Sequence, residues 1–66
     1  MEPKFPNIKV KLVGEDGNAF AILGRVQRAM RTNGVSREVT NQYMEEATHG
    51  DYNNLLSVTA KWVTVL

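Results

Sequence analysis

The sequence predicts a small single domain of the α+β class, in which one strand is followed by three helices and a short second strand. Three observations lead to this prediction: an alternating apolar and polar run near the beginning, three segments with helical apolar spacing behind a capping residue, and a β-branched segment at the end. The 66 residues suffice for one domain, 1–66, and are too few for two.

The first strand is predicted over residues 7–13, "NIKVKLV". Ile8, Val10 and Leu12 fall on one face, and the lysines between them fall on the other, which is the pattern of a half-buried strand. Pro6 lacks an amide hydrogen and marks where strand pairing would begin. The segment "GEDGN" then predicts a turn.

The first helix is predicted to begin at Ala19, with Asn18 as its cap, and to end at Asn33 and Gly34. Its apolar positions are Ala19, Ile22, Leu23, Val26, Ala29 and Met30. Gly24 interrupts this helix, where a glycine costs about 1 kcal/mol relative to alanine. The close approach of another group to Gly24 would explain this glycine. That group could belong to the same chain or to a second subunit, and both alternatives stay open, with a ligand as a third.

Two further helices are predicted behind Ser36 and Asp51, which are good capping residues, and Gly50 ends the first of them. In the second helix the apolar stripe consists of Val35, Val39, Tyr43, Met44 and Ala47. In the third helix, which begins at Tyr52, the residues expected to face inward are Leu55, Leu56, Thr59, Trp62 and Val63. The final "WVTVL" is β-branched and predicts a short strand, which gives the first strand a partner. Pairing within one chain and pairing across two chains both stay open, because the local pattern is the same in either case.

Composition limits what can stabilise so short a chain. A core of this size rarely supplies more than about 3 to 5 kcal/mol, and small proteins usually add disulfides, a metal or a second subunit. The sequence has no cysteine and a single histidine, and its seven acidic residues form no calcium-loop pattern. We therefore expect no metal and no cofactor, and we expect a homo-oligomer whose association also completes the small sheet.

Charge is unevenly distributed, although the net charge is only +1. Residues 1–35 carry six cationic and three anionic side chains, whereas residues 36–51 carry one cationic and four anionic side chains. This polarity suits an anionic partner or attraction between two copies. No apolar run approaches the roughly 20 residues that cross a bilayer, and "MEPKFPNIK" lacks the apolar core of a signal peptide. We expect a cytoplasmic protein without membrane contact.

The sequence contains no pattern that predicts catalysis. The turn "GEDGN" lacks the lysine and the serine or threonine of a phosphate loop, and its carboxylates would oppose an anion there. Ser36 and Ser57 are interpreted as a cap and a helix residue without a neighbouring base, and Glu45 and Glu46 point about 100° apart on a helix. We expect no enzyme and no catalytic residue.

A binding surface is predicted on the first helix and on the loop before it. Arg25, Arg28 and Arg31 recur every three residues, and their guanidinium groups suit phosphates, although an ordinary solvated helix face is the commoner origin of such a pattern. If two copies faced each other across Gly24, these arginines could line a pocket for an anionic nucleotide. The predicted binding residues are Asn18, Phe20, Gly24, Arg25, Arg28 and Arg31.

The blocks "KVKLVGEDGNAFAILGRVQRAMR", "GDYNNLL" and "KWV", with an acidic second helix between them, cover most of residues 7–64. In these blocks the chain resembles a family of short proteins found in bacteria and their phages. The resemblance implies a small stand-alone protein of mobile-element type and brings no characterised active site with it. Phage proteins of this size commonly bind a host protein, a nucleic acid or a nucleotide signal, which is an argument from class alone.

These observations lead to two function hypotheses from different classes. The first is a non-enzymatic, self-associating protein that engages or sequesters a host protein or an anionic nucleotide, including as an anti-defence inhibitor. The alternative is a small DNA- or RNA-binding protein that uses the arginines of the first helix, and a near-neutral net charge counts against it. A structural subunit of a larger particle is a third interpretation.

Overall fold

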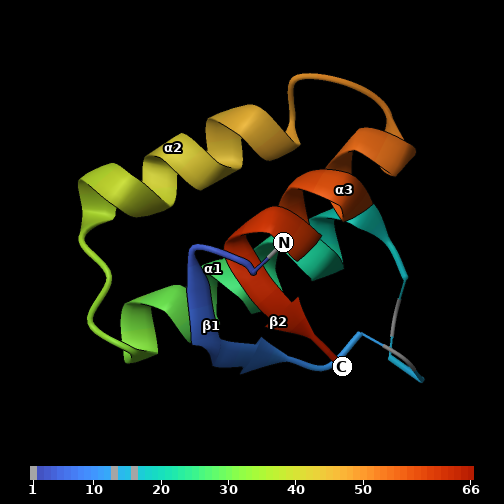
Figure 1. The fold of residues 1–66 in the computed structure, drawn as a ribbon. Helices are drawn as coiled ribbons and strands as arrows, with labels where there is room; N and C mark the ends of the chain where they lie inside the picture. Colours follow the sequence, from blue (N-terminus) through green and yellow to red (C-terminus); the bar gives the residue numbers. More distant parts are fainter. Residues whose placement is uncertain (1, 13, 16) are drawn as a thin grey trace.

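The computed structural model describes residues 2–12, 14, 15 and 17–66 and confirms the predicted α+β class and the order of the elements (Figure 1). Two sequence predictions, the last strand residue Val13 and the turn residue Asp16, lie outside the described residues. The elements are β1 (Phe5–Val10), α1 (Ala19–Thr32), α2 (Arg37–Ala47), α3 (Tyr52–Trp62) and β2 (Val63–Val65).

The two strands form a parallel pair that brings the two ends of the chain together. Pairing continues past β1, because the amide of Leu66 donates to the carbonyl of Val10 (2.8 Å) and the amide of Leu12 donates to the carbonyl of Leu66 (3.0 Å). The strand begins earlier than predicted and contains Pro6, whose carbonyl accepts the Thr64 hydroxyl at 2.7 Å. Proline lacks only the donor, so its acceptor still ties β1 to β2.

The predicted caps are confirmed at all three helices. The side chains of Asn18, Ser36 and Asp51 accept the amides of Phe20, Val39 and Asn54 at 2.8, 3.2 and 2.9 Å. Each cap satisfies an amide that has no partner inside its own helix. The end of α1 is set by Gly34, which has a φ of +82° that suits glycine.

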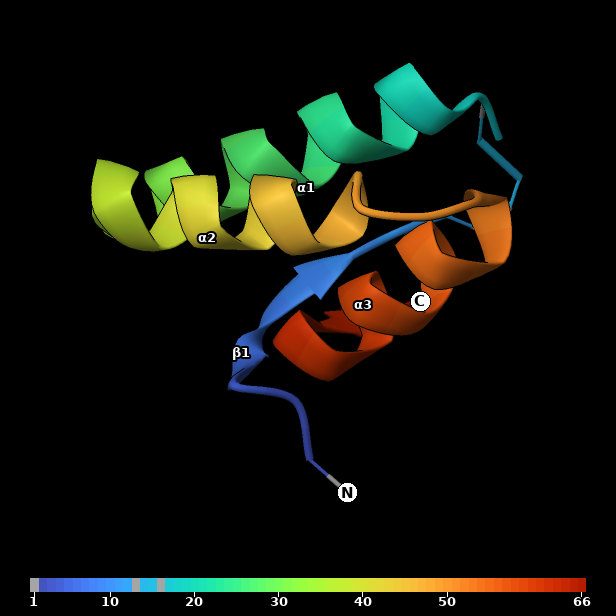
Figure 2. The ribbon, with the colours of Figure 1, turned by 90° about the horizontal axis from the view of Figure 1, so that it is seen from above.

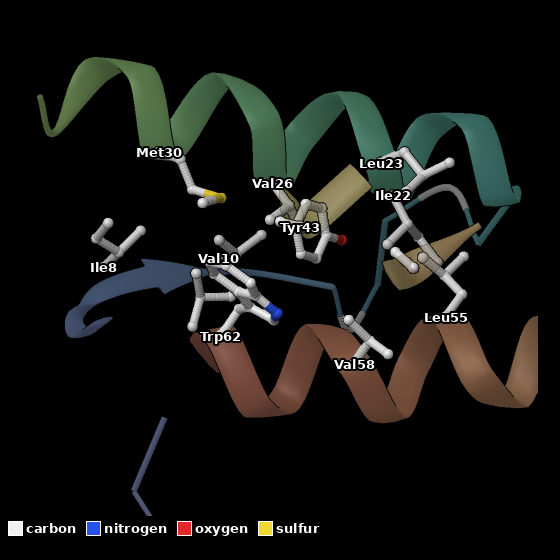
Figure 3. Packing of buried hydrophobic residues seen from close by; sticks show 12 residues of the cluster. Ile8, Val10, Ile22, Leu23, Val26, Met30, Tyr43, Leu55, Val58 and Trp62 are labelled. Carbon is white, nitrogen blue, oxygen red and sulfur yellow. The ribbon is translucent and has the colours of Figure 1, made fainter. Parts of the chain in front are cut away.

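The hydrophobic core lies between α1 on one side and α3 on the other, beside β1 (Figure 3), and α2 runs next to α1 (Figure 2). The strand β2 contributes Val63 to this core. In α3 the buried positions are Leu55, Val58, Thr59 and Trp62. The prediction that Leu56 faces inward is wrong, since 37% of this residue is exposed. Leu56 lies about 100° around the helix from Leu55, outside the face that these positions share.

One polar pair is enclosed by this core. The Tyr43 hydroxyl and Thr59 Oγ1 are 2.8 Å apart and join α2 to α3, and both residues are fully buried. Burial raises the pKa of Tyr43 above its usual value of 10, while the hydrogen bond to Thr59 opposes part of this rise. The phenol therefore stays protonated at neutral pH and keeps its hydrogen available to the pair.

Replacing Tyr43 by phenylalanine tests how much this pair stabilises the fold. We expect Tyr43→Phe to lower the free energy of unfolding by about 1–3 kcal/mol, because Thr59 loses its buried partner. Urea unfolding monitored by circular dichroism measures this change. The double variant Tyr43→Phe/Thr59→Val, which removes both polar groups, should recover part of the loss, and a single variant as stable as the parent chain would contradict the argument.

Candidate functional site

The candidate site is the side of α1 that points away from the core, which we call the α1 outer face. Two shallow hollows of about 320 and 590 Å³ lie on it, and Gly24 and Arg28 line both of them. The α1 outer face consists of Phe20, Ala21, Gly24, Arg25, Gln27, Arg28, Arg31 and Thr32. It arises because the buried residues of α1, Ile22, Leu23, Val26 and Met30, all lie on the opposite side of the helix.

Gly24 lies at the centre of this face, and no described residue of the same chain comes close enough to require it. Apart from its chain neighbours and the backbone of its own helix, no atom of the described residues lies within 4 Å of a Cβ built on Gly24, and the residue is exposed. Contact within the chain, one of the alternatives left open by the sequence, therefore does not explain the glycine. The other two alternatives, a second subunit and a ligand, stay open.

Phe20 lies one turn before Gly24 and leaves 83% of its surface exposed. Its position is fixed at the backbone, because its amide donates to Asn18 Oδ1 and the loop just before it is tied to α3. That tie is the Tyr52 hydroxyl, which donates to the Gly17 carbonyl at 2.6 Å. The backbone of Phe20 is therefore held in place while its ring is exposed, and a single exposed apolar side chain is by itself ordinary on a protein surface.

The guanidinium groups of the three arginines of α1 have no hydrogen-bond or ion-pair partner among the described residues. Arg28 and Arg31 are exposed, whereas Arg25 is partly buried and its Nη1 atom is shielded from solvent without an acceptor. A guanidinium nitrogen in that state loses hydration without gaining a hydrogen bond. The α1 outer face therefore presents positive charge that the rest of the described chain does not neutralise.

The predicted binding residues are only partly brought together. Phe20, Gly24, Arg25 and Arg28 line one hollow, and Arg31 lines the other with Gly24 and Arg28. Asn18 is a helix cap, and its contribution is to hold the start of α1.

Sequence reasoning missed two features of the site. Gln27 and Thr32 line one hollow and Ala21 lines the other without having been predicted as binding residues, although the helical spacing places Ala21 on the small-residue side with Gly24. The Tyr52 contact with Gly17 joins residues 35 positions apart and leaves no local pattern in the sequence.

A third hollow, of about 470 Å³, lies between α2 and α3, and its lining mixes acidic, basic, neutral polar and apolar side chains: Gln42, Glu45, Glu46, His49, Asn54, Val58 and Lys61. Glu46 belongs to it, and its polar atoms already serve the fold. Its Oε1 accepts the Trp62 Nε1 hydrogen at 3.3 Å, and its carbonyl accepts Asn54 Nδ2 at 3.0 Å. We therefore place the candidate site on α1 and treat this hollow as the seam between two packed helices.

Within the described part of the chain, no cluster of three or more His, Cys, Asp or Glu residues could hold a metal ion. None of the helices formed by the described residues is long and apolar enough to span a bilayer. No family model, curated protein or solved structure matches the chain.

Replacing Gly24 by alanine tests whether the space around it is open. We expect Gly24→Ala to raise the free energy of unfolding by about 0.5–1 kcal/mol, because alanine is the better helix former and its Cβ meets nothing. Urea unfolding at low protein concentration measures the change. Gly34→Ala is the matched control and should destabilise the fold, because its φ of +82° strains a side chain. A Gly24→Ala monomer that is less stable than the parent chain would show that the space beside Gly24 is already occupied.

Proposed function

We propose that this chain is a non-enzymatic binding protein of phage or mobile-element type that associates with itself and engages a host component through the α1 outer face. The host component is a protein or an anionic nucleotide, which the assembly binds or sequesters as an inhibitor. The observation that supports this proposal is Gly24, which weakens α1 and is left unexplained by contacts with the described residues of its own chain.

The neighbours of Gly24 supply the chemistry of binding. Phe20 offers an exposed ring to an apolar or aromatic group, and Arg25 and Arg28 offer donors to an anion in the same hollow. The hollow of about 320 Å³ is shallow, and a second copy laid across Gly24 would deepen it and add its own arginines. A paired assembly is therefore better suited to hold a small anionic ligand than one chain.

A nucleic acid is the alternative partner, and one observation favours it. The exposed Phe20 ring lies beside arginines, and a ring next to cationic groups is what single-stranded nucleic acids use for base stacking and phosphate contact. The whole chain carries a net charge of only +1, so the attraction would come from α1 alone.

Gly24→Leu tests the proposal directly. We expect native mass spectrometry of the gently purified parent chain to show an oligomer, and extra mass that disappears on denaturation if a ligand is held. Gly24→Leu should give a folded monomer without that mass, because the leucine fills the space for the second copy. Ala60→Leu, at an exposed position of α3, is the matched control and should assemble normally. Unchanged mass and unchanged partner binding in Gly24→Leu would refute the proposal.

Salt dependence separates the proposal from its alternative. If three arginines neutralise phosphates of a single strand, affinity should fall by about 20-fold between 50 and 200 mM salt, since the slope is about −0.7 per phosphate. We expect the fluorescence anisotropy of a labelled oligonucleotide to show no binding with this steep dependence on salt. We also expect the oligomer of the chain to persist over the same range of salt concentration. A steep, Arg28-dependent curve on a monomeric chain would favour the nucleic-acid function instead.

A further inference from the structure

We infer that two copies of this chain pair antiparallel along α1, with a two-fold axis at Gly24 and with Phe20 of each copy against Arg28 of the other. This inference rests on the proposed self-association and specifies its geometry. It follows from three properties of the α1 outer face, which are the spacing of its residues, the space at Gly24 and the distribution of charge.

The spacing is symmetric about the glycine. Phe20 and Arg28 lie four residues before and after Gly24, so all three share one side of the helix and are separated along its axis by about 6 Å per step. In an antiparallel pair centred on Gly24, each residue faces the residue of the other copy whose number, added to its own, gives 48. Phe20 of one copy then lies at the same height as Arg28 of the other, and the contact occurs twice.

The space at Gly24 permits the approach that this pairing requires. Packed helices have axes about 8–10 Å apart, and Cα atoms lie about 2.3 Å from each axis. Two facing glycines at the crossing point add no side chain between the backbones, and no described residue fills the space where a Cβ would stand. A larger residue at this central position would separate the helices and pull Phe20 away from Arg28.

The contact satisfies two groups that are exposed without partners in the single chain. Phe20 is 83% exposed, and the guanidinium group of Arg28 has no hydrogen bond or ion pair to any described residue. A guanidinium over a phenyl ring is a favourable arrangement, and burying the ring against a second helix removes it from water. In the dimer Phe20 and Arg28 therefore find their partners in the second copy, and Arg25 of each copy is the cationic side chain of the smaller hollow that is left for an anion.

The direction of pairing follows from charge. In a parallel pair each arginine of α1 would face the same arginine of the second copy, and like charges would be brought together. In the antiparallel pair the Arg31 end of one helix lies beside the loop that precedes the other helix, and this loop carries Glu15. The antiparallel direction also sets the two helix dipoles in opposition, which is favourable for neighbouring helices.

Charge substitutions at Phe20 test this geometry, because the expected partner is a cation. Phe20→Glu should keep the dimer, with its dissociation constant within about threefold of the parent value, since a carboxylate can pair with Arg28 of the second copy. Phe20→Lys should weaken the dimer at least tenfold, since two cations would meet. Sedimentation equilibrium measures both constants. The high exposure of Phe20 leaves the fold intact in either variant.

The controls are Ala60→Glu and Ala60→Lys, which make the same charge changes at an exposed position of α3 and should leave both constants unchanged. A parent oligomer that Phe20→Glu and Phe20→Lys weaken equally would overturn the Phe20–Arg28 contact while leaving self-association standing. A parent chain that is monomeric throughout would overturn the proposed self-association as well. Weaker dimerisation by Phe20→Glu than by Phe20→Lys would point to a contact with an acidic group instead.

Discussion

Trp62 is the side chain on which the arrangement of the elements depends. It is the last residue of α3, and its buried ring lies edge-on to Tyr43 of α2 and stacked with Phe5 of β1, at centroid distances of 5.9 and 6.1 Å. Its Nε1 hydrogen reaches Glu46, and Lys4 Nζ lies 4.0 Å from the ring centroid. One residue thus fixes α2, α3 and β1 relative to one another, and the chain enters β2 immediately after it.

The strand topology decides which side of α1 is buried. Because the parallel strands join the ends of the chain, all three helices lie in the connection between them, and α1 packs beside β1 and α2 with its apolar side inward. The core buries only one side of α1. The other side is left without cover by any described element, although it carries a large exposed ring and positive charge.

The local features of this fold and the pairing of its two strands could be predicted from the sequence, whereas most contacts between separate elements could not. Helix caps, helix starts and the alternation in β1 depend on residues that are neighbours in the sequence. The structure confirms the caps at Asn18, Ser36 and Asp51. The α1 outer face was predicted for the same reason, since one helical period defines it. The Tyr52–Gly17 contact, the Tyr43–Thr59 pair and the exposure of Leu56 depend on how separate elements meet, which no local pattern encodes.

The features of the α1 outer face are best understood together. A glycine that weakens a helix, a phenylalanine left in water and an arginine nitrogen buried without an acceptor are each unfavourable in a chain with a small core. All three lie within six residues of one another on the same element, whereas the rest of the fold shows satisfied caps and a hydrogen-bonded buried polar pair. Local costs that gather on one surface are expected where a protein makes contact with something outside its own chain, because binding then recovers what folding alone does not.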